Sequence, residues 1–299
     1  MMDFFEKIKH GLIILGISFK MIWKNKTYLI FPLITTLIIT TVIIAIIMYA
    51  GIGYGISIST DQPTQTMALI VALFLLMFVS SMIAMFISVS CADYTMQSLQ
   101  TSNPRLDAAF SHSLSRFDAI IKWALLSAIV GLIFRIFASG RNNNGGPSLL
   151  TNIWSEMAGL AWGLAIFFMP SVIASETLGT FASLKRSTTL MKNTFGQSFA
   201  AGFGFSLVFG LVIFLVPLGL VSFYTLSFDY LLLPLGLMVA PEIRFVAFFV
   251  AIPLITIFLL ALISTAQTIF KTAVYAYATG KPTGPFPSGL IQTSFVKEH

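Results

Sequence analysis

The chain has 299 residues, of which 57% are hydrophobic and 9% are charged, and its formal net charge is +6. Soluble domains carry roughly 25% charged residues, so this composition excludes a water-soluble globular protein and indicates that lipid surrounds most of the chain. The single cysteine, Cys91, excludes an internal disulfide and a cysteine-based metal site.

Six stretches are apolar and long enough to cross a bilayer, because about 20 helical residues cover the ~30 Å hydrocarbon core. These predicted spans are residues 28–50, 67–90, 119–138, 149–174, 198–226 and 245–270. The charges before the first span argue against a cleaved signal peptide, so we expect an uncleaved anchor there. We therefore predict an all-α fold, a polytopic bundle of about six transmembrane helices that forms a single integral membrane domain over residues 1–299.

Three segments between the spans have an amphipathic character. Residues 1–26, 105–118 and 176–196 combine basic side chains with apolar residues at helical spacing, which predicts amphipathic helices on the cytoplasmic face. Each of these segments precedes a pair of spans. This recurring order suggests three helical hairpins around a common axis.

Two further segments do not cross the membrane. Residues 228–241 are apolar but too short to span, so they form either a re-entrant segment or, as we prefer, a lid on the outer side. After the last span we expect the helix to continue through Tyr277. Residues 280–299 then begin with a run rich in proline and glycine, which predicts an extended cytoplasmic tail.

The distribution of Lys and Arg predicts the orientation. With the N-terminus inside, fourteen of the seventeen Lys and Arg residues fall on the inner side, and only Arg135, Arg141 and Arg244 fall on the outer side. Cytoplasmic loops carry such an excess of positive charge. We therefore expect a multi-pass protein of the cell (inner) membrane with cytoplasmic N- and C-termini.

Several stretches carry a resemblance to a known family. They are RFDAIIKWALLSAIVGLIFR (116–135), WSEMAGLAWGLAIFFMPSVIASE (154–176), FASLKRS (181–187) and AVYAYATGKPTGPFP (273–287). In these stretches the chain resembles an uncharacterised family of six-helix prokaryotic integral membrane proteins. More distantly, it resembles the membrane domain fused to some glycerophosphodiester phosphodiesterases. The resemblance implies a topology and assigns no activity.

Two charges within the predicted spans form a candidate polar seam. Arg135 lies near the outer end of the third span and Glu156 lies about two turns into the fourth. Intramembrane charges cost several kcal/mol each, so each needs a partner or a purpose. They either line a water-filled path or bind an anionic headgroup, or they form a structural ion pair that fixes the register of the hairpin.

Charged side chains at the inner interface give two further candidates. Lys185, Arg186 and Lys192 are expected to contact anionic phospholipid headgroups, besides keeping their loop inside. Asp118 and Lys122 have the spacing of an ordinary helical pair at the interface. Asp93, just beyond the second span, is expected to be solvated, and a coupling-ion site is the alternative. Trp123 is expected to be an interface anchor.

The sequence lacks the motifs of common enzymes and metal sites. The three histidines are far apart, and no P-loop, dinucleotide fingerprint or HExxH motif occurs, so we expect no catalytic residue, no metal and no cofactor. The favoured hypothesis is a membrane protein that handles or transports a small solute, ion or lipid. The alternative is a non-transporting scaffold that organises lipids or partner proteins. We expect the lipid bilayer as the partner and no nucleic acid, and we leave a homo-oligomer open.

Overall fold

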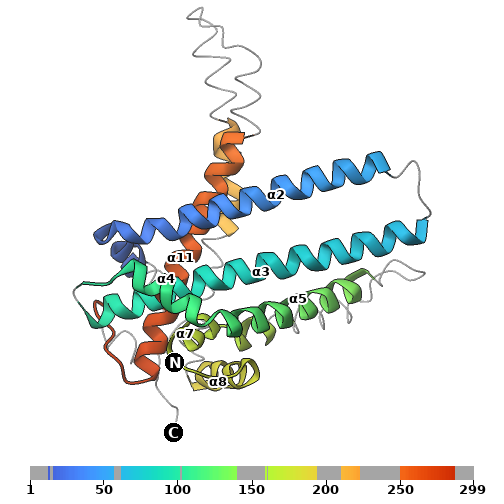
Figure 1. Cartoon of the computed structure of the whole chain (residues 1–299). Helices are drawn as coiled ribbons and strands as arrows, with labels where there is room; N and C mark the ends of the chain where they lie inside the picture. The colour runs from blue at the N-terminus through green and yellow to red at the C-terminus, as the bar shows by residue number, and fades with distance from the viewer. Residues whose placement is uncertain are drawn as a thin grey trace, which may run out of the picture. The chain divides into compact units, whose positions relative to one another are not determined.

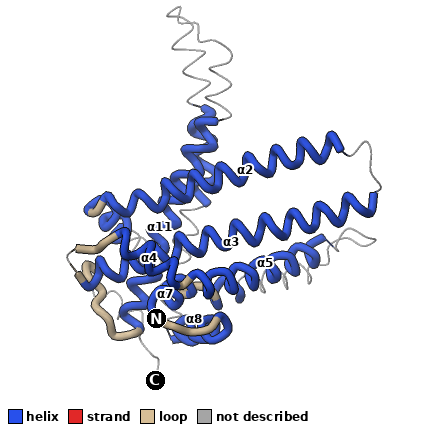
Figure 2. The backbone as a smooth tube through the Cα atoms, viewed as in Figure 1, coloured by secondary structure: helices blue, strands red, loops and turns tan. Residues whose placement is uncertain are grey.

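The computed structural model describes residues 13, 16–56, 62–101, 103–139, 159, 161–193, 210–222 and 250–286. Within these residues the chain forms helices joined by turns, and they contain no strand (Figures 1 and 2). The all-α prediction is therefore confirmed. The labelled helices are η1 (Lys26–Leu29), α2 (Ile30–Ile56), α3 (Gln62–Gln100), α4 (Leu106–Ser115), α5 (Phe117–Ser139), α7 (Met169–Ser175), α8 (Thr180–Asn193) and α11 (Ile252–Ala278).

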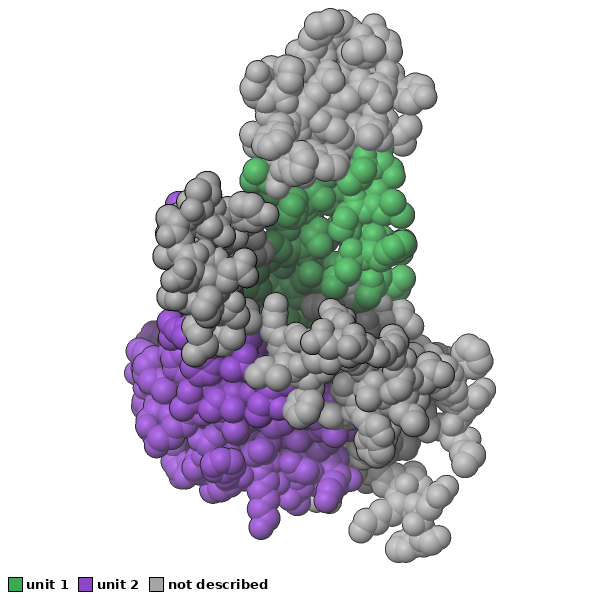
Figure 3. All heavy atoms as spheres, turned by 90° about the vertical axis from the view of Figure 1, so that its right-hand side faces the viewer, with its two compact units in different colours: residues 1–40, 199–267 green, residues 41–198, 268–299 purple. Residues whose placement is uncertain are grey.

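The chain divides into two compact units, which Figure 3 colours separately. Unit 1 comprises Met1–Thr40 and Phe199–Gln267, and unit 2 comprises Thr41–Ser198 and Thr268–His299. The candidate site described below lies within unit 2.

Several of the described helices are long and apolar enough to cross a membrane. Three meet this test as single helices: Phe74–Gln100, Phe117–Phe134 and Ile252–Ala278. Two bent pairs meet it together: Gly16–Lys24 with Lys26–Val42, and Ala161–Ser175 with Thr180–Lys192. If each bent pair is one span, these helices overlap five of the predicted spans, and the shorter apolar helix Gly210–Ser222 lies within the remaining one. The membrane nature of the chain is thus supported, and the number six stays a prediction.

The helix α2 illustrates why lipid imposes a helix on this sequence. Its run of Ile and Thr residues is β-branched and would favour a strand in water. In lipid, however, each backbone N–H and C=O needs a partner within the segment, which only a helix provides for a single span. The hydroxyls of Thr35 and Thr36 donate back to the carbonyl oxygens of Phe31 and Pro32, at 2.8 and 2.7 Å. Pro32 itself lies in the first turn, where no N–H is needed.

The helix α3 is longer than a membrane span. Its 39 residues extend about 58 Å at 1.5 Å per residue, roughly twice the thickness of the hydrocarbon core. The predicted end of the span at Ser90 is therefore not the end of the helix, which continues to Gln100 just before Asn103 and Pro104. Burial follows the same division: Val71, Leu75 and Val79 are exposed, whereas most residues from 85 to 99 are buried.

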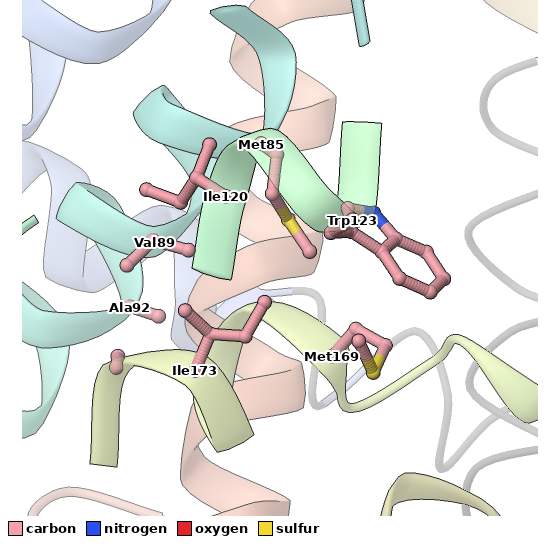
Figure 4. Packing of buried hydrophobic residues seen from close by; sticks show 8 residues of the cluster. Met85, Val89, Ala92, Ile120, Trp123, Met169 and Ile173 are labelled. Atoms are coloured by element: carbon pink, nitrogen blue, oxygen red, sulfur yellow. The ribbon is translucent and has the colours of Figure 1, made fainter. Parts of the chain in front are cut away.

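The core of unit 2 forms where α3, α5 and α7 meet. Figure 4 shows Met85, Val89 and Ala92 of α3 facing side chains of α5 and α7. The other labelled members are Ile120, Trp123, Met169 and Ile173. Trp123 stacks on Trp162, with the ring centroids 5.8 Å apart and the planes 8° from parallel. Only 4% of Trp123 is exposed, so the expectation that it anchors the interface is wrong: its ring fills the core.

The tail folds back onto α3 rather than leaving the bundle. Gly280 follows the end of α11 and has a φ of +70°, a conformation that residues with a side chain rarely adopt. The N–H of Lys281 donates to the carbonyl oxygen of Ala276 at 2.7 Å and closes the last turn. Gly284 has φ of +56° and lies against Leu99, and Phe286 is buried. Through Phe286 the tail is therefore made of turns, and the rest of the predicted extended tail lies outside the described residues.

Candidate functional site

The side chain of Glu176 is the centre of a polar junction in unit 2. Glu176 caps the end of α7, and its extended backbone, with φ of −126° and ψ of 141°, directs the chain out of the helix. Its Oε1 accepts a hydrogen bond from Nε of Arg186 at 3.0 Å and another from the hydroxyl of Tyr275 at 2.8 Å. The carboxylate thus joins three elements: the end of α7, the second turn of α8 and the last turn of α11.

The local sequence explains how Glu176 and Arg186 meet. Residues 176–179 are non-helical and end in Gly179, so four residues separate the end of α7 from the start of α8. The predicted amphipathic helix over residues 176–196 therefore starts later than expected. The axis turns by 118° between Ala161–Ser175 and Thr180–Lys192, which brings α8 back across the end of α7. Figure 1 accordingly shows α8 almost end-on below α5.

Two buried hydrogen bonds reinforce this junction. The hydroxyls of Ser171 on α7 and Thr272 on α11 lie 3.1 Å apart, and both side chains are buried. The hydroxyl of Ser187 on α8 accepts the backbone N–H of Phe168 at 3.1 Å, at the start of α7. A buried N–H without a partner costs about 1–3 kcal/mol, so Ser187 stabilises the break that precedes α7. Small hydroxyl residues therefore hold α8 and the end of α11 against α7.

Two lysines add positive charge to the same junction. Nζ of Lys271 lies 4.8 Å from the centre of the Phe167 ring, and Nζ of Lys281 lies 5.7 Å from the centre of the Tyr275 ring. Ammonium groups within about 6 Å of an aromatic face are attracted by its quadrupole. Together with Arg186, these lysines give the described junction more positive than negative charge.

The outer face of α8 differs from the face that packs on α7. Phe181, Lys185, Thr189 and Lys192 are exposed, and they lie within about 80° of one another around the helix. Phe181 is 75% exposed, an unusual value for an aromatic side chain in water. The opposite face buries Ser183, Ser187, Leu190 and Met191. We call Phe181, Lys185, Thr189 and Lys192 the outer face of α8.

The structure separates the three predicted headgroup-binding residues. Lys185 and Lys192 belong to the outer face, whereas Arg186 points inward and bonds to Glu176 with its side chain 41% exposed. Nζ of Lys122 lies 2.7 Å from a carboxylate oxygen of Asp118, and both side chains are largely exposed. The predicted polar seam of Arg135 and Glu156 falls outside the described part of the structure. Arg135 lies on α5, but its side chain is not described, and Glu156 lies outside the described residues.

Asp93 is a further polar centre, and the expectation that it is solvated is wrong. Its side chain is 16% exposed, and its Oδ1 lies 3.0 Å from Nδ1 of His112 on α4. Its Oδ2 accepts from Nε2 of Gln97 at 2.8 Å, and Oε1 of Gln97 accepts the backbone N–H of Arg105 at 2.9 Å. This chain of bonds fixes the turn between α3 and α4. Within the described residues, no group of three or more His, Cys, Asp or Glu side chains could hold a metal ion.

Sequence inspection alone missed Glu176, Tyr275 and the pair of Asp93 with His112. The two partners of Glu176 lie 10 and 99 residues away from it, and Asp93 and His112 are 19 residues apart. Such separations carry no periodic signal. One clue was present for Glu176: it is an acidic residue directly after an apolar span, near the basic residues of the next helix.

Comparison with protein families gives one finding. A model of a family of unknown function, DUF6159, matches residues 65–285. The chain belongs to this family. The match supports the resemblance to an uncharacterised family and extends from the start of α3 to the tail beside Leu99. It therefore includes Glu176, Arg186 and Tyr275. No curated protein matches the chain.

Proposed function

We propose that this member of the family binds anionic phospholipid headgroups at the cytoplasmic membrane surface through the outer face of α8, and so organises or handles lipids without catalysing a reaction. The observation that carries the proposal is the combination of an exposed aromatic ring, Phe181, with two exposed lysines, Lys185 and Lys192. A ring of this kind lies favourably at the interface, and each nearby lysine contributes about 1 kcal/mol of attraction to an anionic surface.

The polar junction supports this role by holding α8 in place. Because Arg186 is bonded to Glu176, we assign it to the anchoring of the helix, and we assign Lys185 and Lys192 to the headgroups. The buried hydroxyl of Ser187 adds a second attachment. A helix fixed in this way presents its lysines without the loss of conformational entropy that a flexible loop undergoes on binding.

The finer predictions of location belong to the same proposal. The excess of Lys and Arg on the inner side supports an inner-membrane protein of prokaryotic origin, with both termini in the cytoplasm. We also propose the distant kinship with the membrane domain of phosphodiesterase fusions. The proposal needs neither a cofactor nor a homo-oligomer.

Native mass spectrometry of the full-length protein in mild detergent tests the proposal. The measurement compares the affinity for phosphatidylglycerol with that for phosphatidylcholine, in the wild type and in a Lys185→Gln/Lys192→Gln variant. We expect the variant to lose about 30-fold of its affinity for phosphatidylglycerol and to keep its affinity for phosphatidylcholine. Lys122→Gln is the matched control, because Lys122 is an exposed lysine paired with Asp118. An unchanged preference in the double variant would overturn the proposal.

Transport through a seam of Arg135 and Glu156 is the second candidate function. It rests on the cost of intramembrane charge alone, and its test is given in the Discussion.

A further inference from the structure

The helix Gly16–Lys24 in unit 1 has two opposite faces. Ser18 is fully buried and Ile22 is 1% exposed, so these side chains form the inner face. Lys20, Trp23 and Lys24 are all exposed, and they lie within about 100° of one another around the helix. Trp23 is 68% exposed, although tryptophan is among the most apolar side chains.

The helix is held at a sharp angle to the candidate span that follows it. The axes of Gly16–Lys24 and Lys26–Val42 differ by 104°, with the bend at Asn25. Oδ1 of Asn25 accepts the N–H of Thr27 at 3.2 Å, and the backbone N–H of Asn25 donates to the carbonyl oxygen of Met21 at 3.0 Å. The bend therefore has its own cap, and it ends one helix and starts the next within a single residue.

The bend determines where this helix lies in a membrane. If Lys26–Val42 crosses the bilayer near the normal, a helix at 104° to it runs nearly parallel to the bilayer plane. Its position one residue before the span puts it at the boundary between headgroups and hydrocarbon. This boundary is where tryptophan is enriched, and its anionic headgroups complement Lys20 and Lys24.

From these observations we infer that the outer face of Gly16–Lys24 is a second lipid-binding surface, seated in the headgroup region of an anionic leaflet, with Trp23 inserted and Lys20 and Lys24 contacting phosphates. This inference is independent of the role proposed for α8, because it uses a different helix in a different unit. The two helices share a design, since each is attached to an apolar helix across a bend of more than 100° and each exposes one large aromatic ring beside lysines.

Fluorescence quenching of Trp23 in the full-length protein tests this inference. A variant with Trp123, Trp154 and Trp162 changed to Phe retains Trp23 alone, and it is reconstituted in nanodiscs that contain phosphatidylglycerol. We expect lipids brominated near the headgroup to quench Trp23 more than lipids brominated near the terminal methyl. Iodide in the buffer should quench it weakly. Efficient quenching by iodide, with no effect of either brominated lipid, would mean that the face lies in water and would overturn the inference.

A depth control and a charge control complete the experiment. Leu37 is 69% exposed on the span, about 16 Å along the helix from Lys26, so a Leu37→Trp variant that lacks Trp23 should respond more to the deeper bromines. In the Trp23-only protein, Lys20→Gln/Lys24→Gln should weaken the quenching by brominated phosphatidylglycerol relative to brominated phosphatidylcholine. Equal quenching by both lipids before and after this change would contradict the phosphate contact.

A second measurement avoids replacing Trp123 and Trp162, whose stacked rings lie in the core. A spin label is attached at Trp23→Cys in a Cys91→Ser background that keeps the other tryptophans, and its collisions with oxygen and with a nickel chelate are compared. Greater exposure to oxygen than to the chelate is the expected result. The reverse order would overturn the inference.

Discussion

Tyr275 donates a hydrogen bond to Oε1 of Glu176, with 2.8 Å between the two oxygens and 99 residues between them in sequence. Tyr275 is 1% exposed, so water cannot replace this bond easily when it is lost. The same carboxylate oxygen accepts a hydrogen bond from Nε of Arg186, so one atom joins the end of α7 to both α8 and the end of α11.

Removing the hydroxyl of Tyr275 should destabilise unit 2. Tyr275→Phe leaves the ring in place and deletes a hydrogen bond to a charged acceptor, so we expect a loss of about 1.5–3 kcal/mol in the free energy of unfolding. Reversible unfolding in detergent measures it. Because both changes weaken the same hydrogen bond, Glu176→Gln combined with Tyr275→Phe should cost less than the sum of the two single changes. Additive effects would show that the two side chains are not coupled.

The tail offers a matched pair of glycine substitutions. Gly284 has φ of +56°, and a Cβ there would lie 2.8 Å from Cδ2 of Leu99. Gly280 has φ of +70° with nothing within 4 Å of such a Cβ. Gly280→Ala should cost the conformational penalty of about 1–2 kcal/mol, and Gly284→Ala should cost more because it also displaces Leu99.

Protease sensitivity of the tail, together with unfolding in detergent, measures this difference. The extra cost of Gly284→Ala should shrink in a Leu99→Ala background, where the clash is absent. Equal costs at the two glycines in the wild-type background would contradict the close approach of the tail to α3.

The carboxyl of Asp107 at the start of α4 provides a test by pH. Arg105 donates a hydrogen bond to it from Nη2, and this bond, with the positive charge, holds the pKa of Asp107 below its ordinary value of 3.8. Any stability that the pair contributes is thus present above the unfolded-state pKa and is lost as pH falls through the folded-state pKa. Arg105→Gln should raise the pKa of Asp107, as followed by its carboxyl ¹³C shift in an NMR titration. An unmoved pKa would exclude the pairing in solution.

Cysteine accessibility tests the transport hypothesis. In a Cys91→Ser background, single cysteines at positions 132–138 and 153–159 are labelled with a membrane-impermeant thiol reagent. A hydrated path would give labelling on one helical face around Arg135 and Glu156, at depths inside the bilayer. Uniform protection would contradict transport through this seam and leave an ion pair that fixes the hairpin.

The helices of this protein follow from the sequence because one physical requirement dominates. Apolar runs such as that of α2 have no alternative in lipid to internal backbone hydrogen bonds, so their helical state needs no knowledge of the neighbouring chain. Their ends are harder to predict. Hydropathy marks Ser90 as the end of a span, but the helix runs on to Gln100, because leaving the hydrocarbon does not break a backbone hydrogen bond.

The pairing of polar side chains could not be predicted in the same way. The position of Asp93 just after a span predicts a solvated carboxylate, and only the packing of α4 along α3 brings His112 to it. Trp123 has the sequence position of an interface anchor, yet the chain places Trp162 against its ring. The pair of Asp118 with Lys122 is different, because both residues lie on one helix and their contact depends on local geometry alone.

The unequal burial along α3 bears on how this protein survives outside its membrane. The half that runs through Val71, Leu75 and Val79 relies on lipid to cover it, whereas the half from Met85 to Leu99 is covered by α4, α5, α7 and the tail. Detergent replaces lipid around the first half, but it has little access to the second. During extraction the buried half of α3, with the elements packed on it, should therefore keep the helices of unit 2 in register. After dispersal by a harsh detergent, refolding of unit 2 should start from this half.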